Sequence, residues 1–417
     1  MKLRFSLCLA VAALFSTVGM EGANAQTLQS FRRVGTLSTA SLHAGAQKLF
    51  GSAAPKRAAQ PLLLYRVTYR TVDMNSRPAT VSGLLAIPQN GAPRGLLLWH
   101  HGTISDTQKA PSNYRVGSKT NSAEGEIALM AFASGGYAIA MPDYLGYGEH
   151  RGAHPYPMGK SNARSALDLA APAREIARRI NRPIGNRVWV SGYSQGGAVA
   201  MWTARFLQER GANLVRSAPL SGPYDLSGAT LDSLLVTPKD DAQLAAQLFL
   251  VGLMGHGYAA NRQSFYSEIF RPAMALAARR NFSRPQSEAE TVKRLAITAK
   301  LMQARSLRDV LNPRFYEAAQ RRDTSHPLIA QLRESDAFEW TPRVPMLLVA
   351  LESDAIVVSE NTKRALSEFR ARGAGKNVVR ALMLRDPNSD HGKAAVPAIL
   401  AARRFFDGGF AAVPGAQ

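Results

Sequence analysis

Short apolar runs alternate with stretches of helical spacing through the first half of the chain. The apolar runs are bounded by turn residues or glycine, and they predict strands at 62–73, 79–88, 95–102, 136–148, 187–193 and 213–222. Apolar positions three and four residues apart predict helices at 122–134, 161–180 and 194–211. We expect Ser161 to cap the second of these helices and Pro172 to kink it. This alternation predicts an α/β fold with a mostly parallel sheet flanked by helices, and with the first two strands as an antiparallel pair at one edge.

The alternation stops over residues 227–342, where helical patterns occur without a strand pattern. It resumes with strands at 345–354 and 377–384 and helices at 359–373 and 391–406. An unstructured loop of that length would be unusual inside a compact domain. We therefore predict a helical cap or lid at 227–342, inserted into an α/β core formed by 61–226 and 343–417. Residues 26–60 have weak periodicity and are interpreted as an N-terminal arm.

The first 25 residues have the three parts of an export signal. Lys2 and Arg4 precede the apolar stretch 5–15, and the small residues "ANA" end at Ala25. We expect 1–25 to be a signal peptide and the protein to be periplasmic or secreted, with a buried N-terminal helix as the alternative. Cys8 is the only cysteine and lies in this segment, so the mature chain would have no disulfide.

Composition narrows the class of protein. The chain has 417 residues, 46% hydrophobic and 19% charged, and a formal net charge of +21. A positive field favours transient contact with anionic surfaces. The basic residues are scattered and are not interleaved with aromatic residues in a tract, so we do not expect nucleic-acid binding. The longest apolar segment, 244–259, is interrupted by polar residues and glycines and does not predict a membrane helix.

The segment "VWVSGYSQGG", 188–197, places a serine between two glycines where a predicted strand meets a predicted helix. G-x-S-x-G in this context forms a sharp turn that exposes the serine at the N-terminus of the helix. Ser194 is therefore the candidate nucleophile. A serine hydroxyl is weakly nucleophilic, so it needs a base, and the base needs a carboxylate that orients it.

Three histidines follow Ser194 in the chain. His256 and His326 lie in the predicted cap, whereas His391 lies in a loop after the last predicted strand. The order serine, acid, histidine is typical of this elbow, so His391 is the candidate base.

Asp354 ends the preceding predicted strand and is the candidate acid. Glu352 is its near competitor. Asp386 and Asp390 lie in the same loop, before His391, and are interpreted as turn-capping residues.

Acyl transfer also needs hydrogen-bond donors for the developing oxyanion. We expect the backbone N–H groups of Gln195, directly after the nucleophile, and of Thr103, in the loop after "LLLWHHG", to form this oxyanion hole. The adjacent His100 and His101 point to opposite faces of a strand and are poor partners for one ion. His150 and His154 near Glu149 are likewise a weak pattern, so we predict no metal and no cofactor.

Five segments, "WHHG", "PDYLGYG", "GYSQGG", "ESDAIVV" and "DHG", have the order and places found in the α/β-hydrolase superfamily. Over about Leu62 to Phe406 the chain resembles secretory lipases of the lipase A-like type, which carry a G-Y-S-Q-G elbow and a helical lid before the acid-bearing strand. The resemblance implies the α/β-hydrolase fold with an inserted cap, and Ser194, Asp354 and His391 as nucleophile, acid and base. Cutinases and some carboxylesterases share the elbow. Secretory lipases generally use disulfides, which the mature chain lacks.

These patterns together predict a serine hydrolase that cleaves carboxylic esters, with a small-molecule or lipid ester as its substrate. The apolar segment Leu248–Met254 would either line an acyl channel or pack the cap onto the core. A secreted peptidase or acyl-peptide hydrolase is the alternative, with paired acids at 240–241 or at Glu288 and Glu290 as anchors for a substrate amine. A non-catalytic binding protein of the same fold is less favoured because the set of three residues is complete. An oligomeric state does not follow from these patterns.

Overall fold

The computed structural model describes residues 27–55, 60–283 and 287–417. The predicted signal peptide lies outside these residues. Within them, nine strands form one sheet in the order β1-β2-β3-β5-β4-β6-β7-β8-β9. The strands are β1 Leu28–Leu37, β2 Leu62–Val72, β3 Pro78–Pro88, β4 Leu96–His100, β5 Ala138–Pro142, β6 Val188–Tyr193, β7 Leu214–Leu220, β8 Met346–Leu351 and β9 Val379–Leu384. The pairs β1–β2, β2–β3 and β3–β5 are antiparallel, and the remaining pairs from β5 to β9 are parallel. The sheet is therefore mostly parallel, as predicted.

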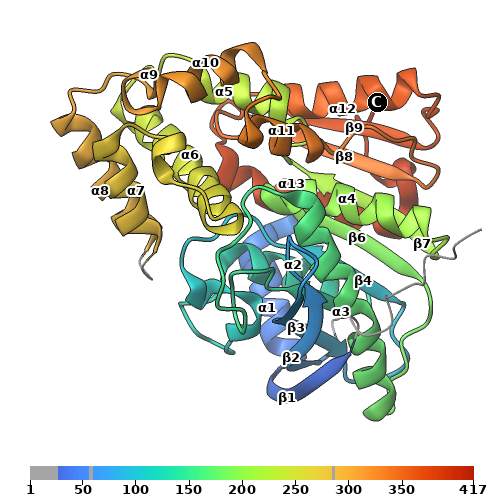
Figure 1. Cartoon of the computed structure of the whole chain (residues 1–417). Coiled ribbons are helices and arrows are strands. Elements are labelled where there is room, and N and C mark those ends of the chain that lie inside the picture. The colour runs from blue at the N-terminus through green and yellow to red at the C-terminus, as the bar shows by residue number, and fades with distance from the viewer. Residues whose placement is uncertain (1–26, 56–59, 284–286) are drawn as a thin grey trace, which may run out of the picture.

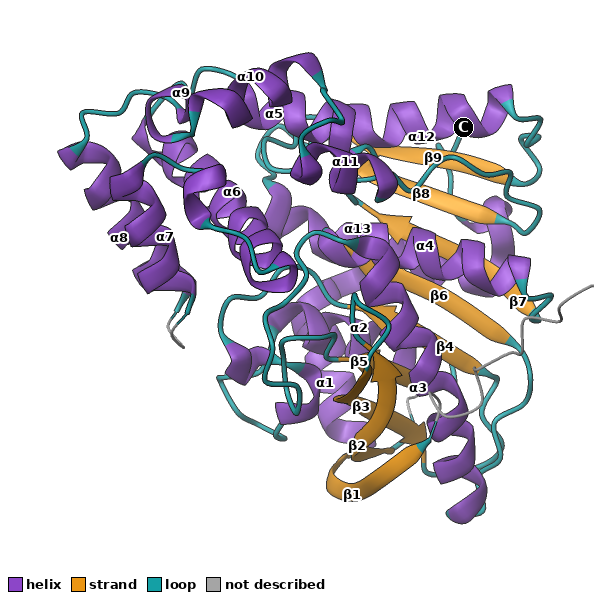
Figure 2. Ribbon diagram, in the orientation of Figure 1, coloured by secondary structure: helices purple, strands orange, loops and turns teal. Residues whose placement is uncertain are grey.

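Helices cover both faces of the sheet (Figure 2). One face packs against α3 Gly159–Arg179, α4 Gln195–Glu209 and α12 Glu360–Ala371; the other packs against α1 Thr39–Phe50, α2 Ala123–Ala133 and α13 His391–Gly408. The strands supply the two apolar layers by alternation. In β4, Leu96 and Leu98 enter one layer, and Leu97 and Trp99 enter the other.

Two local expectations differ from the structure. The segment interpreted as an arm contains β1, which is the edge strand beside β2, and α1, whose Leu42 and Phe50 are buried in the core. Ser161 is not the cap of α3, because the helix begins two residues earlier, at Gly159. The cap position is Met158, which offers no capping side chain, and a Cβ on Gly159 would lie 2.8 Å from the Trp202 side chain, so the helix begins in close contact with α4. The helix continues through Pro172.

The cap is helical, as expected. Its helices are α5 Leu231–Leu235, α6 Asp241–Arg262, α7 Pro272–Phe282, α8 Glu288–Leu301, α9 Leu307–Val310, α10 Pro313–Arg321 and α11 Pro327–Glu334. They enclose an apolar cluster of their own that includes Leu248, Phe270 and Leu328. Figure 1 shows α6 to α10, in yellow to orange, gathered on one side of the sheet. Among the described residues, no helix has the length and apolar character needed to cross a membrane.

Candidate active site

Ser194 occupies a strained turn between β6 and α4. Its backbone has φ 58° and ψ −125°, a region that residues other than glycine rarely adopt. The flanking glycines allow the turn to be this tight. A Cβ on Gly192 would lie 2.4 Å from the Gly196 carbonyl oxygen, and one on Gly196 would lie 2.0 Å from the His100 carbonyl oxygen. No side chain fits at either position, and the turn holds Ser194 at the N-terminus of a helix.

The side chains of Ser194, His391 and Asp354 form one hydrogen-bonded line. The Ser194 Oγ lies 2.8 Å from the His391 Nε2, and the His391 Nδ1 lies 2.6 Å from the Asp354 Oδ2. A carboxylate only accepts, so the Nδ1–H donates to Asp354 and leaves Nε2 free to accept the serine proton. The arrangement has the contacts that base-assisted nucleophilic attack requires.

The loop after β8 fixes the carboxylate. The Asp354 Oδ1 accepts the backbone N–H groups of Ile356 and Val357, both at 2.9 Å. The other oxygen is thereby turned toward His391, and the Asp354 side chain has no accessible surface. A carboxylate held by three donors has little freedom to leave the histidine.

His391 is the first residue of α13 and is held from two sides. Asp390 caps the helix by accepting the Lys393 N–H at 2.9 Å, and the Tyr193 hydroxyl donates to the His391 carbonyl oxygen. The Tyr193 and His391 ring centroids are 5.1 Å apart. Tyr193, which precedes Ser194, therefore also holds His391 in position.

The competing candidates have other partners. Glu352 is exposed and pairs with Arg385 at 3.1 Å, and Asp386 caps a turn by accepting the Asn388 N–H at 2.9 Å.

The two cap histidines lie elsewhere too. The His256 Nδ1 is 2.6 Å from the Tyr266 hydroxyl, and His326 caps α11.

The two expected oxyanion donors lie in the wall of one cavity with Ser194 and His391. Gln195 is the first residue of α4, and Thr103 follows β4 in the adjacent loop. The cavity has a volume of ≈ 540 Å³. From the predicted acyl-channel segment of α6, Phe249, Leu250 and Met254 face this cavity, whereas Leu248, Val251 and Leu253 pack inside the cap.

The model of the alpha/beta hydrolase family matches residues 96–405, about three quarters of the chain. The chain belongs to this family. The hydrolase is 25% identical over 342 residues to a secreted triacylglycerol lipase of Malassezia globosa, a match that covers 81% of the chain and 70% of the relative.

Solved structures of esterases and lipases have the same fold. The rice cell wall degrading esterase LipA of Xanthomonas oryzae is 25% identical, with a TM-score of 0.71 and coverage of 93% of this chain and 96% of that one. Candida antarctica lipase A is 14% identical, with a TM-score of 0.65 and coverage of 93% and 82%. The relatives are lipases and esterases, which supports ester hydrolysis as the class of activity of this hydrolase.

The sequence patterns do not predict where His154 lies in the hydrolase. Its Nε2 lies 2.7 Å from the Gln195 Nε2, and its Nδ1 lies 2.8 Å from the Leu145 carbonyl oxygen. Burial lowers the pKa of His154 to about 3, so the ring is neutral, donates to Leu145 and accepts from Gln195. His154 thus holds the residue directly after Ser194. The only expectation from the sequence for His154 was the weak metal pattern with His150 and Glu149.

The paired histidines His100 and His101 are both buried, and desolvation lowers the pKa of each ring, that of His100 to about 3. His101 contacts the loop that contains Thr103, with its Nδ1 2.7 Å from the Gly102 carbonyl oxygen. Across the described part of the chain, no group of three or more His, Cys, Asp or Glu residues is placed to hold a metal ion.

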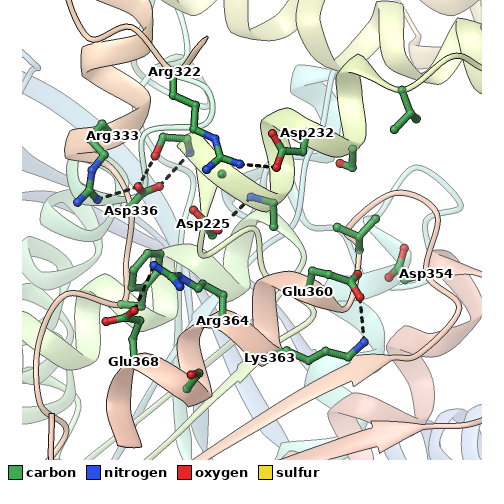
Figure 3. Close-up of a pocket in the computed structure, with 18 of the residues that line it drawn as sticks. Asp225, Asp232, Arg322, Arg333, Asp336, Asp354, Glu360, Lys363, Arg364 and Glu368 are labelled. Carbon is green, nitrogen blue, oxygen red and sulfur yellow. Dashed lines mark hydrogen bonds and ion pairs between the residues drawn. The ribbon is translucent and has the colours of Figure 1, made fainter. Parts of the chain in front are cut away.

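A larger cavity, of ≈ 1230 Å³, lies between α5, α11 and α12 (Figure 3). Its wall contains many charged side chains, and these pair with one another: Arg322 with Asp232, Arg333 with Asp336, Lys363 with Glu360 and Arg364 with Glu368. Asp354 contributes to this wall, but Ser194 and His391 do not. We call it the charged groove, and the cavity beside Ser194 the apolar cavity.

Proposed function

We propose that the protein is a serine hydrolase that cleaves carboxylic esters through an acyl-enzyme intermediate. The observation that carries the proposal is the line from the Ser194 Oγ through His391 to Asp354, at 2.8 Å and 2.6 Å, beside an apolar cavity. Membership of the alpha/beta hydrolase family and the lipase and esterase relatives support the same reaction.

In the proposed mechanism, the His391 Nε2 takes the Ser194 proton as the Oγ attacks the ester carbonyl carbon. The imidazolium that forms is stabilised by Asp354 and then gives its proton to the leaving alcohol. His391 then takes a proton from a water molecule, which attacks the acyl carbon. The bond between the acyl carbon and the Ser194 Oγ breaks, the Oγ takes the proton back from His391, and the acid is released. The steps need no metal and no cofactor.

We propose that the backbone N–H groups of Gln195 and Thr103 stabilise the negative charge on the carbonyl oxygen during both steps. Both residues line the cavity wall beside Ser194. The Gln195 N–H is also at the N-terminus of α4, where the helix dipole favours negative charge.

The apolar cavity supports an ester with a hydrocarbon acyl group as substrate. Besides Phe249 and Met254, its wall includes Leu226, Leu234 and Val292 of the cap region. A volume of ≈ 540 Å³ lies within the usual range of about 300–1,000 Å³ for small-molecule sites. We therefore propose a small-molecule or lipid ester with an alkyl chain in this cavity.

A peptidase remains the second candidate, because Glu288 lies in the cavity wall and a carboxylate there would suit a substrate amine. The other proposed anchors, Asp240, Asp241 and Glu290, are not part of the cavity wall. Asp240 caps α6, and Glu290 pairs with Arg294 at 2.7 Å. A single exposed acid is a weaker anchor than the paired acids that this function requires, so the ester assignment is preferred.

We propose that the protein is exported, with residues 1–25 as its signal peptide and the periplasm or the medium as its destination. The secreted relative of Malassezia globosa supports export. The positive net charge of +21 supports transient contact with anionic surfaces there.

The decisive experiment compares the mature protein with Ser194→Ala on p-nitrophenyl esters of increasing chain length and on aminoacyl p-nitroanilides. We expect ester turnover, and a roughly 10⁴- to 10⁶-fold loss of kcat in the variant. Full ester turnover by Ser194→Ala would show that Ser194 is not the nucleophile. A preference for anilides would favour the peptidase.

A further inference from the structure

Glu124 is an acidic side chain in the wall of the apolar cavity for which the proposed mechanism has no use. It lies in the first turn of α2, after the helix cap Ser122. Its two carboxyl oxygens lie 3.1 Å and 2.9 Å from the Gly102 nitrogen, so Gly102 donates its N–H to this carboxyl group. Gly102 immediately precedes Thr103, the proposed second oxyanion donor.

Gly102 is held tightly between this carboxyl group and the nucleophile. A Cβ added to Gly102 would lie 2.6 Å from the Glu124 Oε2 and 3.4 Å from the Ser194 Cβ. A small change in the carboxyl position therefore moves the backbone that leads into Thr103.

His101 holds the other end of the same residue. Its Nδ1 lies 2.7 Å from the Gly102 carbonyl oxygen, and its ring stacks on Tyr144 with centroids 4.2 Å apart. In a trans peptide the carbonyl oxygen and the following N–H point in opposite directions. Since the Gly102 carbonyl points at the buried His101, the Thr103 N–H points away from it.

From this geometry we infer that Glu124 is a positioning residue for the oxyanion hole, acting through Gly102 and opposite His101. Glu124 accepts the N–H of the peptide before the Gly102 Cα, and His101 contacts the carbonyl oxygen of the peptide after it, which carries the Thr103 N–H. Together they restrict the rotation of Gly102 between the two peptide planes and so the direction of the Thr103 N–H. The inference rests on the proposed function, and it concerns the rate of the chemical step rather than the binding of the ester.

The charge of Glu124 provides a readout. Burial raises the pKa of Glu124 to about 8, although the hydrogen bond from Gly102 lowers it. Below that pH the acid is neutral; above it, a negative charge lies close to the developing oxyanion and opposes it. We expect kcat to decline as the pH rises through about 8.

Several titratable groups face Glu124 or lie near it. His391 and Glu288 share the cavity wall, and Tyr193 and Tyr144 lie close enough for the Glu124 charge to raise their pKa values. Burial raises the pKa of both tyrosines further, so neither ionises near pH 8. On α2 itself, Glu126 faces Asn121 and Tyr114 instead of the cavity.

The test compares Glu124→Gln with Glu124→Met on a p-nitrophenyl ester, across pH 6 to 10. Glutamine keeps an acceptor for the Gly102 N–H but cannot ionise; methionine has a similar size but no such acceptor. We expect Glu124→Gln to keep kcat within about threefold at pH 7 and to lose the decline near pH 8. We expect Glu124→Met to lower kcat about 10- to 100-fold with KM changed less than about twofold, because a loosened donor mainly affects the transition state.

Glu126→Gln is the matched control on the same helix, and its pH profile should follow that of the unaltered protein. If Glu124→Met does not fold, Glu124→Asp replaces it, since the shorter acid cannot reach Gly102; its kcat should fall similarly. The inference would be overturned if Glu124→Met and Glu124→Gln had equal kcat values. It would also be overturned if Glu124→Gln still showed the decline of kcat near pH 8.

The Ser194→Ala variant distinguishes a failure of the positioning role of Glu124 from a failure of the proposed function. Ester turnover that requires Ser194 but is unaffected by Glu124→Met removes only the positioning role. Turnover that survives Ser194→Ala removes the proposed function, and the positioning role with it.

Discussion

The loop 352–358 separates two cavities that differ in the number of charged side chains in their walls. On one side, Ile356 and Val357 face the apolar cavity of ≈ 540 Å³ that contains Ser194 and His391. On the other, Glu352, Ala355 and Val358 face the charged groove of ≈ 1230 Å³. The proposed acid, Asp354, lies between them with its carboxylate directed at His391.

The difference shows that size and charge do not by themselves locate chemistry. In the larger groove the charged side chains form ion pairs, most of which are exposed to solvent. Within each pair the two opposite charges neutralise one another. In the smaller cavity a few polar groups converge on Ser194 within an apolar wall, which is typical of ligand sites. If this distinction is right, substitutions on the two sides of the loop should affect different properties.

Asp354→Asn should have the largest effect. The asparagine keeps the shape of the side chain but can no longer hold His391 in the required tautomer or stabilise its charged form. We expect kcat to fall about 10³- to 10⁴-fold, with KM changed little. Steady-state kinetics on a p-nitrophenyl ester measure this.

Glu352→Gln is the control from the same loop, where Glu352 is exposed and pairs with Arg385. It should leave kcat/KM unchanged. A large loss in Glu352→Gln with little loss in Asp354→Asn would assign the acid to the groove side of the loop.

Asp336→Ala should have the next largest effect, on stability rather than on kcat. Asp336 is buried beneath the charged groove, where it accepts from the Ser227 N–H at 3.0 Å, the Ser227 hydroxyl at 2.6 Å and Arg333 at 3.0 Å. Truncation leaves the buried N–H and hydroxyl of Ser227 without a hydrogen-bond acceptor. We expect the free energy of unfolding in urea to fall by about 2–4 kcal/mol.

Glu339→Ala is its matched control, because Glu339 is the exposed partner of the same Arg333. Its cost should stay below about 1 kcal/mol. An equal loss of unfolding free energy in the two variants would contradict the view that burial, rather than the presence of a charge, determines how much these acids stabilise the protein.

Much of this arrangement could be predicted from the sequence. The strand–helix alternation located the sheet and the cap, and the chain order around "GYSQGG", "ESD" and "DHG" nominated the three residues that the structure brings within hydrogen-bond distance. Such local patterns suffice because each residue follows the carboxyl end of a strand in a mostly parallel sheet, where those ends meet at one edge.

Glu124, His154 and the edge strand β1 could not be predicted in the same way. Glu124 has the ordinary place of an acid in a first helical turn, and only the fold brings it against Gly102. His154 contacts Gln195 across 41 residues of sequence. The strand β1 has a weakly periodic sequence because only one of its residues, Leu37, is fully buried, and its pairing with β2 is established by the sheet.

Ala246→Phe should have a moderate effect that depends on the substrate. Ala246 is a small residue of α6 in the wall of the apolar cavity, and a phenyl ring there would take up space that a long acyl chain needs. We expect kcat/KM for long-chain p-nitrophenyl esters to fall about 10- to 100-fold, while the acetate ester is hydrolysed as before.

Ala273→Phe, on an exposed position of α7, is the control for the added ring and should leave the chain-length profile unchanged. An equal loss for acetate and long-chain esters in Ala246→Phe would place the acyl chain outside this cavity.

Arg322→Ala should have the smallest effect. Arg322 forms an ion pair with Asp232 across the charged groove, but both side chains are more than half exposed, so solvent and salt screen their attraction. We expect the free energy of unfolding to change by less than about 1 kcal/mol, and kcat/KM for every ester chain length to stay the same. A double-mutant cycle with Asp232→Ala isolates the pair energy, which should shrink further in high salt. A chain-length-dependent loss of kcat/KM in Arg322→Ala would instead show that substrate reaches the groove, and the separation made by the loop 352–358 would no longer hold.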